Sequence, residues 1–338
     1  MDKALNPLIS VLMPVYNCSN YINEAVMSIL NQNYEQFELF IIDDCSTDGT
    51  IEAINFINDH RITIIKKPTN TGLTHSLNIG IELAKGKYIA RMDGDDISLL
   101  DRFEKQINYM ESNPDIIICG GGYEIINSDN KYQPSLSNGE LLFEMIDHCP
   151  FVHPAIMMRR DILERYNVKY DPAYEPAEDY KMWIELSKYG KIANIPEILI
   201  KYRVHENQTS NKRVKQQMEI ANKIALSQVK RLSNSNTYSE YYINRIVESI
   251  SDLKKYKSVQ VDIKEFFEKN RIKIHSKYLS SRARLYYIEV LSKDNFSIPM
   301  FFKRLPILIN IVNILGFLFI IKYIIKSFIY WKSVKTSK

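Results

Sequence analysis

The sequence predicts an α/β protein built on a mixed, mostly parallel sheet flanked by helices, and three observations carry this prediction. Apolar strand-like runs alternate with amphipathic helix-like segments, and the connections between them are short. The first run, residues 8–15 (LISVLMPV), is apolar almost without interruption, as expected of a strand buried on both faces. Polar residues follow directly after the strand-like runs, at the edge where parallel sheets bind their ligands.

The elements can be assigned in order along the chain. After the first strand, a helix is expected over residues 20–32, because its apolar positions form a single stripe. A glycine run, Gly120–Gly122, follows an apolar stretch and is interpreted as a strand end with close backbone approach. Between these regions the sequence predicts strands at 37–42, 62–66 and 88–92, with helices at 50–58 and 73–84.

The strand at 88–92 ends in three closely spaced carboxylates. They belong to Asp93, Asp95 and Asp96. Gly94 is expected to allow a tight turn at this point. Three anions this close repel one another unless a cation lies between them, and oxygen ligands favour Mg²⁺ or Mn²⁺ with positions left for phosphate oxygens. The alternative is a solvated acidic turn in which Asp96 caps a helix beginning near Leu99.

Five segments in a fixed order extend this pattern over about residues 7–210. They are SVLMPVYNCSNYINEAVMSILNQNYEQFELFIIDDCSTDGT, NTGLTHSLNIGIELAKGKYIARMDGDD, His153-Pro154 before AIMMRR, EPAEDYKMWIEL and YRVHENQTS. In this order they resemble the catalytic region of family 2 glycosyltransferases, whose GT-A fold is Rossmann-like. A dinucleotide-binding dehydrogenase would instead need G-x-G-x-x-G after the first strand, where this chain has PVYNCS.

The resemblance implies a binding region for a nucleotide-sugar. Pro14, Val15 and Tyr16 resemble the loop that lies along the base and ribose. Asp44 matches a carboxylate that accepts the N3–H of uracil, which is chemically sensible because an ionised carboxylate only accepts hydrogen bonds. The alternative for Asp43 and Asp44 is that they satisfy backbone amides in the turn that follows.

The resemblance also assigns metal and phosphate contacts. Asp95 aligns with the direct metal ligand, and Asp93 with a contact to the ribose, the metal or its bound water. His205 resembles a histidine that reaches the metal or the diphosphate, although a lone histidine is often structural. Arg203 is expected to contact phosphate oxygens, and His153 is expected to line or support the donor site.

The chemistry of glycosyl transfer requires a general base for the acceptor hydroxyl. Asp179 resembles this base, and Glu178 resembles a supporting residue that orients the acceptor or the loop. The alternative is ordinary capping, because both lie at the predicted start of a helix, where carboxylates are favoured.

The C-terminal part of the chain has a different character. Three regions are predicted: a catalytic domain at 1–210, a helical extension at 211–294 with helices near 213–232, 240–259 and 264–292, and a basic hydrophobic segment at 295–338. The last segment has seven basic residues and no acidic one, in a chain whose net charge is only +4. It predicts attachment to an anionic membrane surface, either lying in the interface or spanning once; the alternative is a helix packed on the catalytic domain. Four scattered cysteines and no expected signal peptide indicate a reducing cytoplasm.

Together, the resemblance implies an inverting, Mn²⁺- or Mg²⁺-dependent glycosyltransferase at the cytoplasmic face of the bacterial inner membrane. It would move glucose or galactose from a UDP-sugar to a lipid-diphosphate-linked saccharide, GlcNAc- or GalNAc-diphospho-undecaprenol, in O-antigen or capsule synthesis, and form a β-glycosidic bond. Other donors (UDP-GlcNAc, UDP-GalNAc, dTDP-rhamnose) and a protein or teichoic acceptor remain alternatives, and no nucleic-acid partner is expected. The chain lacks the glycine- and basic-rich phosphate loop that a nucleotidyltransferase would have after its first strand. An inactive scaffold that only binds sugar nucleotides is not favoured, because it would not need the residues assigned to catalysis.

Overall fold

A computed structural model describes residues 8–146, 148–205, 208 and 213–232 of the chain. The chain divides into two units, Met1–Ile224 and Ala225–Lys338, and apart from the end of one helix everything below lies in the first. The helices predicted at 240–259 and 264–292 and the segment 295–338 lie outside the described residues. Among the residues that are described, no helix has both the length and the apolar character that crossing a bilayer requires.

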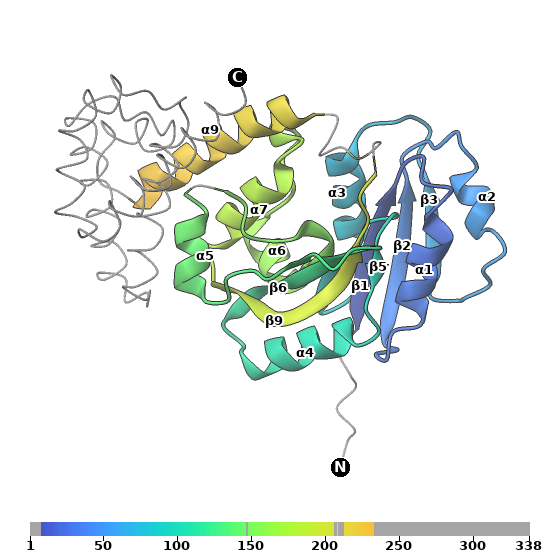
Figure 1. Ribbon diagram of the computed structural model, residues 1–338, viewed down its shortest axis with the longest axis horizontal. Coiled ribbons are helices and arrows are strands. Elements are labelled where there is room, and N and C mark those ends of the chain that lie inside the picture. Colours follow the sequence, from blue (N-terminus) through green and yellow to red (C-terminus); the bar gives the residue numbers. More distant parts are fainter. Residues whose placement is uncertain (1–7, 147, 206–207, 209–212, 233–338) are drawn as a thin grey trace, which may run out of the picture. The chain divides into compact units, whose positions relative to one another are not determined.

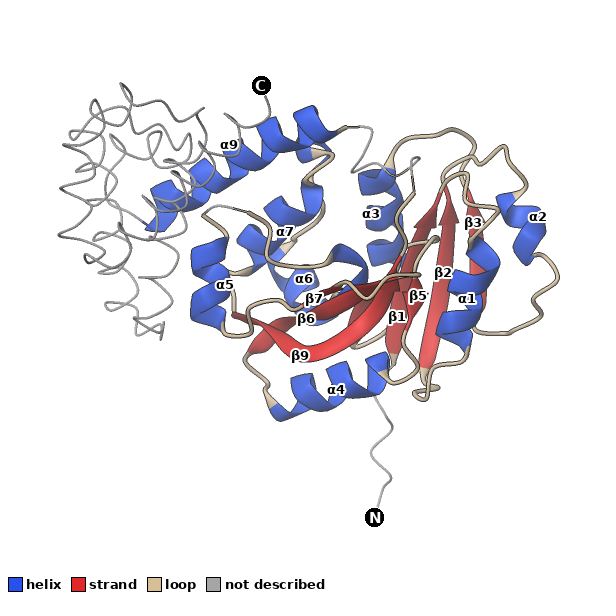
Figure 2. Cartoon of the chain, in the orientation of Figure 1, coloured by secondary structure: helices blue, strands red, loops and turns tan. Residues whose placement is uncertain are grey.

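Within the described residues, nine strands form one mixed sheet (Figures 1 and 2). Its order is β3-β2-β1-β4-β8-β6-β9-β5, with β7 paired to β6. The first four strands in this order are parallel, and β8 reverses the direction because it pairs antiparallel with both β4 and β6. The strands are β1 (Ile9–Val15), β2 (Phe37–Asp43), β3 (Ile62–Lys66), β4 (Tyr88–Arg91), β5 (Ile97–Ser98), β6 (Ile116–Ile125), β7 (Lys131–Tyr132), β8 (Met157–Arg159) and β9 (Lys191–Tyr202).

Helices flank the sheet, as the sequence predicts (Figure 2). The helix predicted at 50–58 ends early, because after Ile54 the chain closes a tighter turn with Ile57 N–H donating to Ile54 O. The helices are α1 (Ile22–Leu30), α2 (Thr50–Ile54), α3 (Leu73–Leu83), α4 (Arg102–Ser112), α5 (Asn138–Glu144), α6 (Arg160–Tyr166), α7 (Glu178–Leu186) and α9 (Val214–Leu232), with short 3₁₀ turns η1 (His153–Ala155) and η2 (Pro172–Tyr174).

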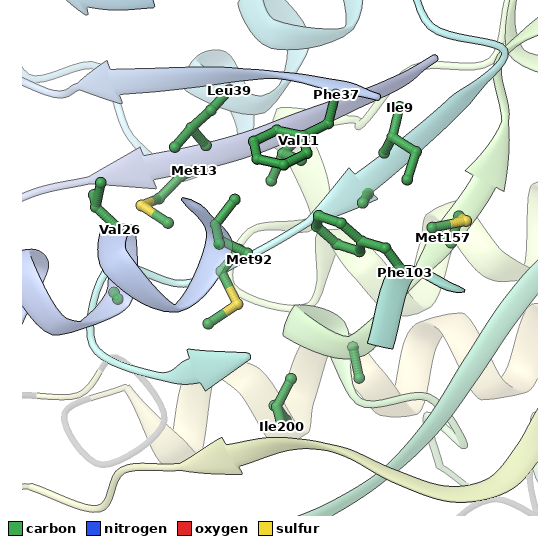
Figure 3. Close-up of a cluster of buried hydrophobic side chains, with 14 of the residues drawn as sticks. Ile9, Val11, Met13, Val26, Phe37, Leu39, Met92, Phe103, Met157 and Ile200 are labelled. Atoms are coloured by element: carbon green, nitrogen blue, oxygen red, sulfur yellow. The ribbon is translucent and has the colours of Figure 1, made fainter. Parts of the chain in front are cut away.

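The central strand β1 is buried on both faces, which explains its unbroken apolar sequence. Alternate residues such as Val11 and Met13 join the cluster drawn in Figure 3, where β1 and β2 meet side chains of α1 and α4. On the opposite face Leu12 packs against α3 at Gly80, where a Cβ atom would lie 2.8 Å from Leu12 Cδ2. Packing on both faces therefore holds β1 in position, and with it the carboxyl end of the strand, where the polar residues lie.

The glycine run Gly120–Gly122 does not end a strand, so that part of the prediction was wrong, whereas the close approach of neighbouring backbone is confirmed. Strand β6 continues through it to Ile125 and pairs with β9 and β7 on either side. A Cβ atom at Gly120 would lie 2.3 Å from Asn194 Oδ1, and one at Gly121 would lie 2.5 Å from Leu199 Cδ1. The glycines are needed because neighbouring groups approach too closely for any side chain.

Candidate active site

Polar residues from four parallel strands meet at the carboxyl edge of the sheet. Tyr16 follows β1, Asp43 ends β2 and Asp44 follows it, Lys67 follows β3, and the acidic cluster follows β4. The strands lie side by side and point the same way (Figure 1), so their ends are neighbours. The sequence predicts this arrangement, because neighbouring parallel strands bring their carboxyl ends to the same edge of the sheet.

The three aspartates after β4 form one cluster. Ligand atoms of Asp93, Asp95 and Asp96 all lie within 4.8 Å of one another. Burial and the charges of Asp93 and Asp95 raise the pKa of Asp96 well above its usual value. Its buried Oδ2 has no hydrogen-bond partner in the described part of the chain. Crowded carboxylates with an unsatisfied oxygen are a donor set that suits a hard divalent cation.

Gly94, between these aspartates, lies in a turn as expected, but the turn does not use a positive φ at this residue. The glycines with positive φ in the described residues are Gly49 and Gly72. At Gly94 a Cβ atom would instead lie 2.8 Å from Val15 Cγ1. The residue allows the acidic loop to lie directly against the end of β1.

Asp96 does not cap a helix, so that alternative was wrong. The short strand β5 follows it, and α4 begins only at Arg102. Asp96 Oδ1 instead accepts a hydrogen bond from the backbone N–H of Arg203 at 2.8 Å. The pairing of β5 with β9 brings this distant segment to the acidic loop.

The end of β9 places two predicted residues at the cluster. His205 Nε2 lies 2.9 Å from Asp95 Oδ2. The Arg203 side chain is bound by the protein itself, because its Nε donates to the Asp95 carbonyl oxygen at 2.8 Å and its Nη2 to Glu24 at 2.5 Å. Arg203 also lies over the Tyr21 ring, 4.7 Å from its centroid. His205 therefore lies beside the Asp95 carboxylate. Arg203 instead binds the backbone of the loop that carries Asp95.

Arg91 is a charged residue of the candidate site that the sequence analysis did not single out. It is a buried cation at the end of β4, 3% exposed, and it forms an ion pair with Asp93. Its charge opposes the rise that burial causes in the pKa of Asp179, and it adds to the lowering that burial causes in the pKa of His153. The signal in the sequence was a charged residue inside the otherwise apolar run YIARM, since arginine is rarely buried without a partner.

The predicted base lies at the start of α7, in the same electrostatic environment as the cluster. Burial raises the pKa of Asp93, and the charges of Asp95 and Asp179 add to this shift. Burial raises the pKa of Asp179 itself, although Arg91 opposes the shift. The Cys149 Sγ lies 3.7 Å from Asp179 Oδ2. An aspartate with a raised pKa is better matched to accepting a proton than an exposed one.

The capping alternative holds in part for Asp179, which is not the N-cap of α7 but accepts the Tyr180 N–H at 2.7 Å in the first turn. The N-cap of α7 is Ala177, and Glu178 and Asp179 occupy the first helical positions. Glu178 is 3% exposed, and its Oε2 is without a hydrogen-bond partner among the described residues. Burial and the neighbouring Asp179 charge raise the pKa of Glu178 to about 8.

This raised pKa predicts a pH-dependent stability. Between pH 4.5 and about 8 the folded chain holds a proton on Glu178 that the unfolded chain has lost, so the free energy of unfolding falls as pH rises. The substitution Glu178→Gln removes the titrating group and with it this pH dependence of the free energy of unfolding. In denaturant titrations we expect the variant to match the wild type at pH 4 and to be more stable at pH 9, by on the order of 3 kcal/mol.

A matched control is Glu185→Gln on the same helix. Burial acts to raise the pKa of Glu185, but the hydrogen bonds and charges of Lys188 and Lys181 outweigh it and the pKa is lowered, so Glu185 stays ionised over the range in which Glu178 titrates. This variant should therefore leave the slope between pH 5 and pH 9 unchanged. Parallel profiles for Glu178→Gln and the wild type would show that Glu178 titrates as an ordinary carboxyl group.

Both acids after β2 accept hydrogen bonds from backbone amides. Asp43 Oδ1 accepts from Ser46 N–H at 3.1 Å. Asp44 accepts from Thr71 N–H at 2.8 Å and from Gly72 N–H at 2.9 Å. Asp44 in addition forms a buried ion pair with Lys67, a residue that the sequence reasoning also missed.

The other predicted binding residues differ in exposure. Tyr16 is 51% exposed at the sheet edge, whereas Val15 is buried and Pro14 lies inside β1. His153 Nε2 lies 3.0 Å from the Tyr170 hydroxyl, and its ring packs against Trp183. Burial, together with Arg91, lowers the pKa of His153 well below its usual value, so this imidazole is neutral at pH 7.

A curled α/β sheet with an acidic cluster and a buried carboxylate at one edge defines the class of GT-A glycosyltransferases. The fold is similar to TarS of S. aureus, solved in complex with UDP-GlcNAc, with a TM-score of 0.56 at 14% identity over 76% of this chain and 81% of that one. It is also similar to the mannosyltransferase PcManGT from Pyrobaculum calidifontis, solved with GDP-Man and Mn²⁺, with a TM-score of 0.51 at 15% identity over 86% and 87% of the two chains.

The sequence comparison identifies the family. The family model described as glycosyl transferase family 2 matches residues 10–166. An uncharacterised glycosyltransferase of Haemophilus influenzae is 36% identical over 254 residues, which are 71% of this chain and 76% of the relative. This chain belongs to glycosyl transferase family 2 and is a glycosyltransferase.

Proposed function

We propose that the chain is an inverting, metal-dependent hexosyltransferase that moves glucose or galactose from a UDP-sugar to a lipid-linked acceptor. The acceptor would be GlcNAc- or GalNAc-diphospho-undecaprenol, in the synthesis of a bacterial O-antigen or capsule. The observation that carries the proposal is the gathering of Asp93, Asp95 and Asp96, whose ligand atoms lie within 4.8 Å of one another, because the diphosphate leaving group of glycosyl transfer needs a site where its charge is neutralised.

The donor is a nucleotide-sugar, as in the complexes of TarS with UDP-GlcNAc and of PcManGT with GDP-Man. In this chain Asp44 would accept the N3–H of the base. Tyr16, half exposed at the edge, offers a ring face to the base or ribose. His153, whose ring contacts the Tyr170 hydroxyl and packs against Trp183, would support the region of the donor sugar.

The metal would be Mn²⁺ or Mg²⁺, held by Asp95 and Asp93 with His205 beside them. Bound there, it would neutralise the charge that develops on the diphosphate leaving group. Arg91 keeps Asp93 in a fixed orientation. The buried Arg102 donates to the Arg91 carbonyl oxygen at 2.8 Å and so holds the strand end that carries the cluster.

Asp179 would take the proton of the acceptor hydroxyl as its oxygen attacks the anomeric carbon. A single in-line displacement inverts the configuration, so an α-linked UDP-sugar gives a β-glycoside. Glu178, buried and protonated through neutral pH, would donate rather than accept a hydrogen bond, which suits a role in orienting the acceptor or the loop.

The decisive experiment is an assay of product release from three substrates. With Mn²⁺ and a UDP-sugar, a transferase slowly releases UDP even without acceptor, and faster with a lipid-diphosphate GlcNAc. Pyrophosphate released from a nucleoside triphosphate would instead identify a nucleotidyltransferase. Release of neither product would identify a binding scaffold and would refute the proposed function.

We also propose that the segment 295–338 attaches the enzyme to the cytoplasmic face of the inner membrane, since it is basic and apolar with no acidic residue. Ending the chain near Phe296 should move the protein from the membrane pellet to the supernatant, while UDP binding is retained. Fractionation in low and high salt measures this. A truncated chain that stays in the pellet would show that the segment is not the anchor.

A further inference from the structure

Lys67 and Asp44 form a buried ion pair at the carboxyl ends of β3 and β2. The Lys67 Nζ lies 2.5 Å from Asp44 Oδ1, and the two side chains are only 4% and 7% exposed. The same Nζ donates to Ser76 Oγ at 2.9 Å. A lysine in this position is fixed rather than solvated, since its charge has been removed from water and has a single acid partner.

The hydrogen-bonding capacity of Asp44 is almost filled by the protein. A carboxylate has about four acceptor directions, two on each oxygen. Oδ1 accepts from Lys67 and from Thr71 N–H, and Oδ2 accepts from Gly72 N–H. Counting the partners in the described part of the chain, one acceptor direction remains, on Oδ2.

Over the same described part of the chain, the ammonium group of Lys67 has one N–H left to donate, next to the acceptor direction that remains on Asp44. Among the described residues, Asp44 and Ser76 take two of its three N–H groups. A buried donor without a partner is costly. A ligand that brings one N–H donor to Asp44 and a neighbouring carbonyl oxygen to Lys67 would complete both groups.

We infer that Lys67 determines base specificity and selects a uracil or thymine nucleotide against a guanine nucleotide. The inference rests on the proposed function, in which Asp44 reads the base. Uracil and thymine present one donor, N3–H, between two carbonyl oxygens. Guanine presents two adjacent donors, N1–H and N2–H₂, which need both oxygens of a carboxylate, and Lys67 and Thr71 have filled Oδ1.

The fold does not decide this question by itself. TarS, with UDP-GlcNAc, and PcManGT, with GDP-Man, are similar to this chain to nearly the same extent, with TM-scores of 0.56 and 0.51. Cytosine and adenine would bring a ring nitrogen acceptor against the remaining Asp44 lone pair, which is repulsive. The side chains around Asp44 therefore carry the discrimination.

The test is calorimetric titration of the full chain, with Mn²⁺ present, against UDP, dTDP, GDP and CDP. The wild type should bind UDP and dTDP with similar affinity and GDP and CDP at least about 100-fold more weakly. In Lys67→Gln the affinity for UDP should fall about 10-fold, and the ratio of UDP to GDP affinity should fall by at least as much. Lys66→Gln, a matched change at the exposed neighbouring lysine, should leave the ratio unchanged.

Far-ultraviolet circular dichroism checks that each variant folds. Lys67→Arg keeps the positive charge beside Asp44 but moves the donors, so it should fold and still lose selectivity. Equal binding of UDP and GDP by the wild type, or an unchanged ratio in a folded Lys67 variant, overturns the inference while the proposed transferase stands. A wild type that binds none of the four nucleotides overturns the proposed function instead.

Discussion

Replacing Asp179 by asparagine should lower kcat by about 10²–10⁴-fold while leaving nucleotide and metal binding almost unchanged. The amide keeps the size of the side chain and can still accept the Tyr180 N–H, so α7 should keep its start. It cannot take a proton from the acceptor hydroxyl. Binding is spared because the contacts proposed for base and metal come from Asp44, Asp93 and Asp95, which follow β2 and β4.

The measurement is a steady-state assay with a lipid-diphosphate acceptor, together with calorimetric titration of UDP. Asp161→Asn, an exposed aspartate on α6, is the matched control and should retain full activity. The wild-type rate should fall on the acid side with a pKa above the ordinary aspartate value of 3.8, because burial raises the pKa of Asp179. Near wild-type turnover in Asp179→Asn, or an α-linked product, would exclude Asp179 as the base.

Removal of the metal should have an equally large effect. We expect EDTA to abolish transfer by the wild type and Asp95→Ala to lower it by roughly 10³-fold or more, because neutralising a diphosphate leaving group contributes several kcal/mol to the transition state. Asp95 is the proposed direct metal ligand, and His205 lies beside its carboxylate. Replacing Asp95 therefore removes the ligand next to which the other proposed ligands lie.

Titration with Mn²⁺, followed by electron paramagnetic resonance, gives a readout that does not depend on turnover. The wild type should bind Mn²⁺ in the presence of UDP, and Asp95→Ala should not. Asp101→Ala, a nearby partly exposed aspartate paired with Lys105, should bind normally. Full activity in EDTA without added metal would remove the metal-dependent mechanism.

The first part of the fold could be predicted because its information is local. The strands from β1 to β4 and the helices between them follow from hydrophobic periodicity, and parallel strands bring their carboxyl ends to one edge. For this reason residue order alone was enough to group Asp44 with the three aspartates after β4. The boundaries moved by a few residues, as at the end of α2.

The second part of the site depends on long-range pairing. His205 meets Asp95 across 110 positions of sequence, and Arg203 meets Asp96 across 107, only because β5 pairs with β9. Two-residue β5 is too short to show a period, so Asp96 was assigned to a helix cap instead. The glycine run in β6 was likewise assigned to a strand end, because the glycines indicate a close approach but do not show that β9 pairs along the strand beyond them.

By itself, the sequence determined the family, the α/β alternation and the identity of the acids at the sheet edge, since these depend on residue type and near spacing. Only the tertiary structure decided which charges face one another. It placed Arg91 against Asp93, with its charge acting on Asp179, and Lys67 against Asp44. A buried cation is stable only beside a group that folding brings to it, and that partner cannot be read from the residues on either side of the cation.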